Sequence, residues 1–212
     1  SPLNSIGLNE IAVFVPNLDN PYYPRLISYL EDILHENKMT MILCCTGNRP
    51  DKEYEQLMKF DTFDISGIIY AFTPTHYTAL RRLSDKRPVI IIGESDYEDI
   101  ITVALDSRKA GYLAAKHLYD LGHRKIAFVS GDMDAVSLSR RRRLEGLTQF
   151  VEEHKNEMAE VVVYTPVDKD VPKDDIGIGY AMTMKLLGQS DSKITAIVGV
   201  NDYTAVGILN AV

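Results

Sequence analysis

A run of four arginines, Arg140 to Arg143, is the densest group of charged side chains in the sequence. The pattern predicts that it lies in the first turns of a helix that begins near Ser137 or Ser139, where the helix dipole disfavours a cation by about 0.3–1 kcal/mol. A guanidinium that forks onto the hydroxyls or carboxylate of a ligand would offset this cost, and so would ion pairs with surface acids. We therefore expect at least one of these arginines to contact a ligand.

Polar and aromatic residues also follow the first and last apolar runs of the chain. Tyr22 and Tyr23 come after a turn over residues 17–21, and because the chain has no tryptophan, stacking on a ligand ring falls to Tyr or Phe. Each tyrosine could equally be a core residue. Asn201 and Asp202 follow the last run, with Asp202 as the expected helix N-cap. Both pairs are candidates for a binding site.

Signatures of catalysis are missing from the sequence. It contains no Gly-x-Ser-x-Gly elbow, no Walker phosphate loop and no Gly-x-Gly-x-x-Gly fingerprint. The five histidines are scattered, and we expect His117 to be a core residue of a helix. Cys44 and Cys45 are adjacent, so they point to opposite faces of a strand and are expected to be reduced thiols. We expect no enzyme activity, no cofactor and no metal.

The composition is that of an ordinary globular chain. The 212 residues include 30 acidic and 23 basic side chains, which gives a formal net charge of −7. This balance argues against a freestanding nucleic-acid-binding domain, which normally presents a basic face, but not against a module attached to one. No apolar run approaches the roughly 18 residues of a membrane span, and the start has no targeting signal, so we expect a cytoplasmic protein without a membrane partner.

Short apolar runs rich in β-branched residues alternate with longer stretches of helical period. Continuous apolar runs are typical of strands buried on both faces, and the alternation predicts βαβ units in doubly wound parallel sheets. The runs cover residues 11–15, 39–45, 67–72, 88–92, 101–105, 125–129, 161–164 and 194–200. The helical stretches cover residues 26–34, 51–60, 77–83, 113–121, 140–153, 176–187 and 202–212.

The spacing of the strands divides them into two groups. Those that begin near residues 11, 39, 67 and 88 form one series, those near 125, 160 and 194 form another, and residues 101–105 connect the two. We interpret this as two α/β lobes. Because ligands of open α/β sheets sit beyond the carboxyl ends of strands, the lobes would share a ligand cleft.

The sequence resembles the effector-binding module of lactose/galactose-repressor-type bacterial transcription regulators. The resemblance extends from about residue 8 to the end, and Leu121–Phe128 with the Asn201-Asp202 pair makes it specific. The matching segments are Ile11–Tyr23, Ile65–Ile69, Leu105–Gly111, His117–Phe128, Arg143–Gly146 and Val200–Gly207.

The resemblance implies an α/β fold of the periplasmic-binding-protein-like type I, with one lobe over residues 8–105 and a second over residues 106–212. It implies a homodimer that binds a small sugar or nucleoside-like effector between its lobes. Closure of the lobes around the effector would change the affinity of a repressor for operator DNA. A periplasmic sugar-binding protein of a transport system uses the same lobes and is the alternative.

Individual residues match the motifs of that family. The resemblance implies that both tyrosines pack on the effector, that Arg143 forks onto it, and that Asn201 and Asp202 approach it from the second lobe. Asp106, at the lobe crossover, would either cap a helix or contact the ligand. The residues so implied are Tyr22, Tyr23, Asp106, Arg143, Asn201 and Asp202.

Departures from the family pattern also bear on the function. Ser66 replaces a common Asp, and Gly93 stands where many members have an Asp, so one polar ligand of the first lobe is missing. No basic helix-turn-helix precedes residue 11, and the family continues beyond Val212 with further strands. We therefore expect the second lobe to be incomplete at its C-terminal end and operator DNA to be bound by a head outside this chain.

Overall fold

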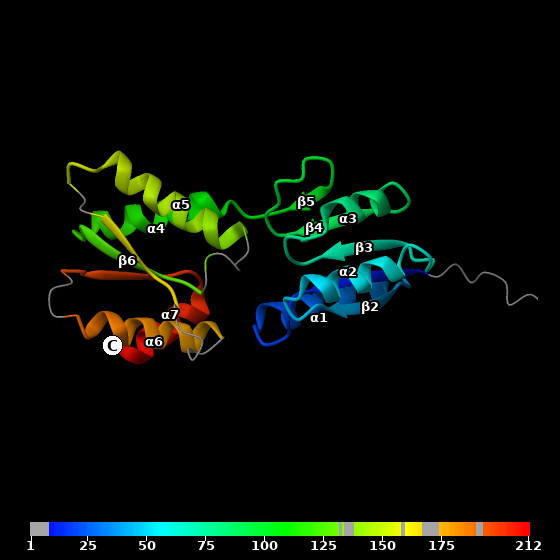
Figure 1. Cartoon of the computed structure of the whole chain (residues 1–212), viewed down its shortest axis with the longest axis horizontal. Coiled ribbons are helices and arrows are strands. Elements are labelled where there is room, and N and C mark those ends of the chain that lie inside the picture. The colour runs from blue at the N-terminus through cyan, green and yellow to red at the C-terminus, as the bar shows by residue number, and fades with distance from the viewer. Residues whose placement is uncertain (1–8, 132, 134–137, 158–159, 167–173, 190–192) are drawn as a thin grey trace, which may run out of the picture. The chain divides into compact units, whose positions relative to one another are not determined.

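A computed structural model describes residues 9–131, 133, 138–157, 160–166, 174–189 and 193–212 (Figure 1). The chain divides into two compact units, Ser1–Leu105 (unit 1) and Asp106–Val212 (unit 2). Each unit has a parallel sheet with helices packed on both faces, which confirms the predicted α/β class and the doubly wound arrangement.

Unit 1 has a parallel sheet with the strand order β2-β1-β3-β4-β5. Its strands are β1 (Glu10–Val15), β2 (Thr40–Cys45), β3 (Gly67–Tyr70), β4 (Val89–Ile92) and β5 (Ile101–Val103). Its helices are α1 (Tyr22–Glu36), α2 (Pro50–Lys59) and α3 (Tyr77–Ser84).

The alternation of side chains along β1 divides the core of unit 1 between the two faces of the sheet. Phe14 packs on the face covered by α2 and α3, where its ring stacks on Tyr70 with centroids 4.5 Å apart. Val13 and Val15 pack on the other face, which α1 covers. Because residues 12–15 of β1 are buried on both faces, they fix the strand end on which the following loop of unit 1 depends.

Unit 2 has a parallel sheet with the strand order β7-β6-β8. Its strands are β6 (Lys125–Val129), β7 (Glu160–Tyr164) and β8 (Ala196–Gly199). Its helices are α4 (Ser107–Asp120), α5 (Leu138–Glu153), α6 (Asp175–Leu187) and α7 (Asp202–Ala211).

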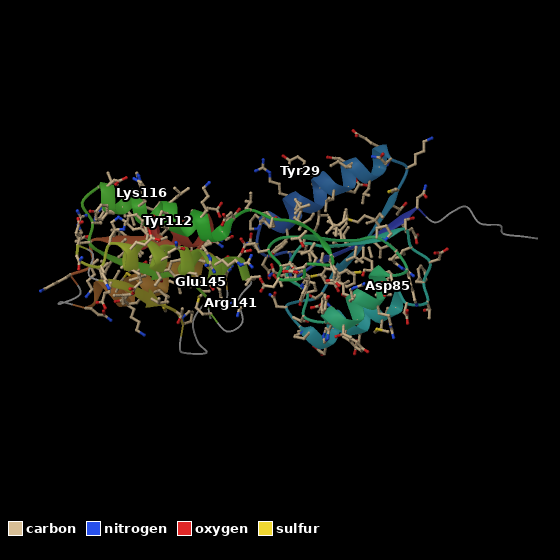
Figure 2. The ribbon with its side chains drawn as sticks, turned by 90° about the horizontal axis from the view of Figure 1, so that it is seen from above. Tyr29, Asp85, Tyr112, Lys116, Arg141 and Glu145 are labelled. Atoms are coloured by element: carbon tan, nitrogen blue, oxygen red, sulfur yellow. The ribbon has the colours of Figure 1, made fainter. Side chains whose placement is uncertain are left out.

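Helices of unit 2 pack in close pairs through glycines. Gly111 of α4 lies against the carbonyl of Arg143, and Gly146 of α5 lies against the carbonyl of Arg108, so the backbones of α4 and α5 approach closely at these points. The two helices lie side by side, with Tyr112 and Lys116 on α4 and Arg141 and Glu145 on α5 (Figure 2). On the other face of the sheet, Gly207 of α7 lies against the carbonyl of Ile176 in α6 in the same way. These contacts set the positions of the helix N-termini at the carboxyl edge of the sheet.

The expectation that His117 lies in the core of α4 was wrong. Leu113 and Leu121 are more than half exposed, and His117 is exposed instead of lying in the core. The buried face of α4 is formed by Gly111 and Ala115, because the backbone of α5 occupies that side. The predicted end of the helix was right, since Gly122 follows it with φ +94°.

Both cysteines of the chain lie in β2. Cys44 is buried and Cys45 is half-buried, and both are free thiols, as expected. None of the helices in the described ranges is long and apolar enough to cross a membrane.

Candidate functional site

In a parallel sheet each helix that follows a strand begins at the carboxyl end of that strand, so loops and helix N-termini gather at one edge. In unit 1 this edge includes the turn after β1. The Oδ1 atom of Asn17 accepts hydrogen bonds from the backbone N–H groups of Asp19 and Asn20, each at 3.2 Å. Asn20 Oδ1 in turn accepts from the backbone N–H of Tyr22 at 3.0 Å. The turn therefore fixes the start of α1.

The two tyrosines that this turn presents differ in their surroundings. Tyr23 is partly buried and packs on the sheet with the apolar face of α1. Tyr22 is 52% exposed and meets Tyr23 edge to face, with ring centroids 5.1 Å apart. Tyr22 is therefore the tyrosine that can stack on a ligand, whereas Tyr23 supports it from the core side.

A buried carboxylate at the same edge of unit 1 was missed by sequence reasoning. Glu53, in the first turn of α2, is only 2% exposed, and its oxygens accept from Thr75 N at 3.0 Å and Thr75 Oγ1 at 2.7 Å. Burial, followed by the charge of Glu53, raises the pKa of Tyr70 far above its usual range. Glu53 thus ties α2 to the loop after β3, a structural task that a lone Glu in a helical segment does not reveal.

In unit 2 the most elaborate polar group joins α5, α6 and α7. Arg140 of α5 makes a bidentate ion pair with Asp175, with 2.8 Å from each terminal nitrogen to a carboxylate oxygen. Both side chains are largely buried. Asn201 Nδ2 donates to the same carboxylate at 2.8 Å. We call Arg140, Asp175 and Asn201 the cross-layer cluster, because α5 and α6 cover opposite faces of the sheet.

The residues after β8 take different roles from those expected. Asn201, and not Asp202, is the N-cap of α7: its Oδ1 accepts from Thr204 N at 2.8 Å and Thr204 Oγ1 at 2.9 Å. The reason is that the extended backbone of Asn201 aims its side chain at the first turn. Asp202 is the first helical residue and is exposed. Asn201 is therefore fixed at both ends of its amide.

The arginine run divides between structural and surface positions. Arg143 is half-buried and donates from Nη1 to the carbonyl of Val200 at 2.9 Å, which places it beside the end of β8. Arg141 is exposed on the surface of α5 (Figure 2). The ion pair of Arg140 with Asp175 offsets the free-energy cost of a cation in the first turn of α5. Arg143 therefore stays the candidate for contact with a ligand, together with Asn201.

Asp106 lies at the start of unit 2. Its side chain accepts a hydrogen bond from the backbone N–H of Lys109 at 2.8 Å, which makes it the N-cap of α4. Of the two roles that the sequence left open, capping is the one that the described contacts display.

Asp175 also escaped sequence reasoning. The acidic pair Asp174-Asp175 before an apolar helix was a detectable signal of an N-terminus, and Asp174 indeed caps α6 by accepting from Gly177 N at 2.8 Å. The partner of Asp175 lies 35 residues away, which no local pattern reveals. No group of His, Cys, Asp or Glu among the described residues has an arrangement that could hold a metal ion.

Comparison with known proteins places this geometry in a family. The model for periplasmic binding proteins and the sugar binding domain of the LacI family matches residues 9–212. The HTH-type transcriptional regulator DegA of Bacillus subtilis (strain 168) is 28% identical over 209 residues, which are 96% of this chain and 59% of DegA. The HTH-type transcriptional repressor PurR of Mannheimia succiniciproducens is 26% identical, with 96% and 59% covered.

A solved structure gives the same result. A LacI family transcriptional regulator from Enterococcus faecium, with bound ribose, superimposes with a TM-score of 0.74 at 26% identity and covers 95% of this chain and 70% of that chain. The present chain spans about three fifths of the length of the two curated relatives. The family match, together with the parallel sheet in each of the two units, confirms the resemblance seen in the sequence. The chain belongs to the family of periplasmic binding proteins and sugar-binding domains of the LacI type.

Proposed function

We propose that this chain is the effector-sensing part of a DNA-binding transcriptional repressor. The observation that carries the proposal is the family match over residues 9–212, joined to a set of polar side chains at the carboxyl ends of the strands. The relatives named above are transcription regulators, which favours a regulator over a transport protein and over an enzyme. The expected compartment is therefore the cytoplasm, where operator DNA is located.

The effector is a small sugar or sugar derivative. The relative from Enterococcus faecium was solved with ribose, and the side chains that match the motifs of the family are of types that suit a polyol. Arg143 offers a planar fork of N–H groups to hydroxyl oxygens, and Tyr22 offers an exposed aromatic face to the apolar side of a sugar ring. Asn201 supplies an amide whose orientation is fixed.

Regulation follows from differential binding. An effector that contacts both lobes binds the closed state more tightly than the open state, and so it shifts the population toward closure. If the closed and open states differ in affinity for operator DNA, this shift changes operator binding, and by linkage operator DNA changes the affinity for the effector by the same factor. The DNA contact itself belongs to a helix-turn-helix segment outside the described residues, as the names of the curated relatives suggest.

A second copy of the chain is the expected protein partner. On α6, Ile176, Tyr180, Met184 and Leu187 are 38–54% exposed, at a spacing that puts them on one helix face. The charged residues of α6 are Asp175 and Lys185, and α7 has only Asp202, so two copies of this acidic protein can meet here without strong repulsion. In sedimentation or light scattering, Met184→Asp should shift a dimer toward monomer, whereas Leu113→Asp on α4 should not. A monomeric wild-type chain would contradict the dimer.

Effector binding is tested by titration calorimetry with D-ribose and a panel of other monosaccharides. We expect at least one sugar to bind, and we expect Tyr22→Ala and Arg143→Ala each to weaken that binding at least tenfold with little loss of thermal stability. Failure of every sugar to bind would contradict the effector class. Unchanged affinity in both variants would contradict the site.

A further inference from the structure

The carboxylate of Asp175 occupies a position that is built to hold an anion. Its oxygens accept hydrogen bonds from both terminal nitrogens of Arg140 and from Asn201 Nδ2. Each donor nitrogen lies 2.8 Å from a carboxylate oxygen. The side chain of Asp175 is 11% exposed and that of Arg140 is 20% exposed, so water screens the pair little. This donor set is the one with which proteins recognise a ligand carboxylate or phosphate.

Asp175 thus uses the groups that an anionic ligand would need. Asn201 cannot turn its amide, because its Oδ1 accepts from Thr204 while its Nδ2 faces the carboxylate. Arg140 cannot turn its fork away without leaving a partly buried carboxylate unpaired, which is costly. The helix N-termini of α6 and α7, which also favour an anion, adjoin Asp175 and Asn201.

We propose that Asp175 is a specificity-determining residue of the effector site, an internal anion that makes the site select neutral polyhydroxy effectors over phosphorylated or carboxylated ones. The inference rests on the proposed function in that it concerns the same site. Asp175 acts through Arg140 and Asn201 and not by touching the effector. An added anionic group would be desolvated without gaining a cationic partner, because Asp175 already occupies Arg140 and Asn201, and this disfavours its binding.

Removal of the carboxylate tests this directly, with inorganic phosphate as the probe. Asp175→Ala frees the fork of Arg140 and the amide of Asn201 and opens the space between them. We expect phosphate to bind this variant at least tenfold more tightly than wild type in calorimetry, and to raise its melting temperature more than equal ionic strength of chloride does. Asp175→Asn removes the charge but keeps the volume, and it serves if the alanine variant fails to fold.

Two control variants separate the specific effect from general electrostatics. Asp174→Asn removes the same charge one residue away and keeps an N-cap, so it should not gain phosphate affinity. Arg140→Gln combined with Asp175→Ala should lose the gain. If Asp174→Asn gains as much as Asp175→Ala, or if the double variant keeps the gain, or if neither Asp175 variant differs from wild type, the proposal is wrong.

A second experiment compares the affinities of the wild-type protein for D-ribose and D-ribose 5-phosphate. Tighter binding of the phosphorylated sugar by wild type would overturn the proposal. If neither sugar binds, the sugar class of the proposed function fails, but the phosphate titrations of the Asp175 variants still decide the role of Asp175. The two failures are therefore distinguishable.

Discussion

Gly146 of α5 lies so close to the backbone carbonyl of Arg108 in α4 that a Cβ atom on it would overlap the carbonyl oxygen. Gly111 has the same relation to the carbonyl of Arg143 in the opposite direction. The two helices are therefore in contact along their backbones. Since α5 carries Arg140 and Arg143, these two glycine contacts determine the backbone positions from which both arginine side chains extend.

Gly146→Ala should strongly destabilise unit 2. The added methyl group meets backbone atoms, which cannot rotate away, so α5 must shift from α4, and overpacking of this kind costs about 1–3 kcal/mol or more. Chemical denaturation followed by circular dichroism measures the loss. Gly188→Ala is the matched control, because its φ of −73° suits alanine and its nearest new contacts are 3.6 Å away. The control should be neutral or stabilising, and equal losses would contradict the packing argument.

Tyr70→Phe should leave the stability unchanged or raise it by up to about 1 kcal/mol. The Tyr70 hydroxyl is fully buried and has no hydrogen-bond partner among the described residues, so its removal ends a desolvation cost. Tyr164→Phe is the comparison, since its hydroxyl donates to Gln189 at 2.8 Å. Loss of that bond should cost about 1 kcal/mol. Thermal and urea unfolding of both variants distinguish the two cases.

Cys44 and Cys45 should differ in their reactivity toward a thiol reagent at pH 8. Burial, partly offset by Lys59, raises the pKa of Cys44 from 9.0 to about 11. At pH 8 a thiol-specific reagent should therefore label Cys45 and leave Cys44 protected in the folded chain. Rapid labelling of both thiols at pH 8 would contradict the burial of Cys44.

The same shift makes stability depend on pH. The unfolded thiol of Cys44 ionises near pH 9 and the folded one only near pH 11, so its contribution is complete below pH 9 and is lost as the pH rises toward 11. Wild type should lose stability over this interval relative to Cys44→Ala, by an amount on the order of 2 kcal/mol. Parallel slopes for the two proteins would contradict it.

Substitution of the two adjacent tyrosines should separate a surface role from a core role. Tyr23→Ala removes a side chain that packs on the sheet and should cost about 2 kcal/mol. Tyr22→Ala loses mainly the edge-to-face ring contact, worth about 1 kcal/mol or less. Differential scanning calorimetry tests the order. A larger loss for Tyr22→Ala would show that Tyr22 is the buried partner.

The order of strands and helices could be predicted because parallel strands are buried on both faces. Residues 11–15 and 125–129 form continuous apolar runs for that reason, and both are strands in the structure. The buried face of α4 could not be predicted from large apolar residues. There the closest packing uses Gly111, which a search for apolar periodicity passes over, and so His117 was assigned to the core although it is exposed.

The candidate site could be predicted only in part. The end of the last strand identified Asn201 as a candidate, whereas the cost of four cations in the first turns of a helix identified the arginine run and the family resemblance identified Arg143. The partner of each side chain depends on tertiary packing. Within the arginine run, Arg140 is the residue whose charge is offset by an internal ion pair. Its partner, Asp175, could not be predicted because it belongs to a helix on the other face of the sheet. Likewise Asn201, and not Asp202, is the cap of α7, because backbone direction and not residue type decided the cap.

The boundary between Leu105 and Asp106 divides the chain into units that are each continuous in sequence. The five described strands of the sheet in unit 1 all precede this boundary, so the ribosome has made them before it begins α4. At roughly 5–20 residues per second, synthesis of unit 2 takes on the order of 5–20 s, far longer than most small domains need to fold. Unit 1 can therefore fold during translation while unit 2 is still being synthesised.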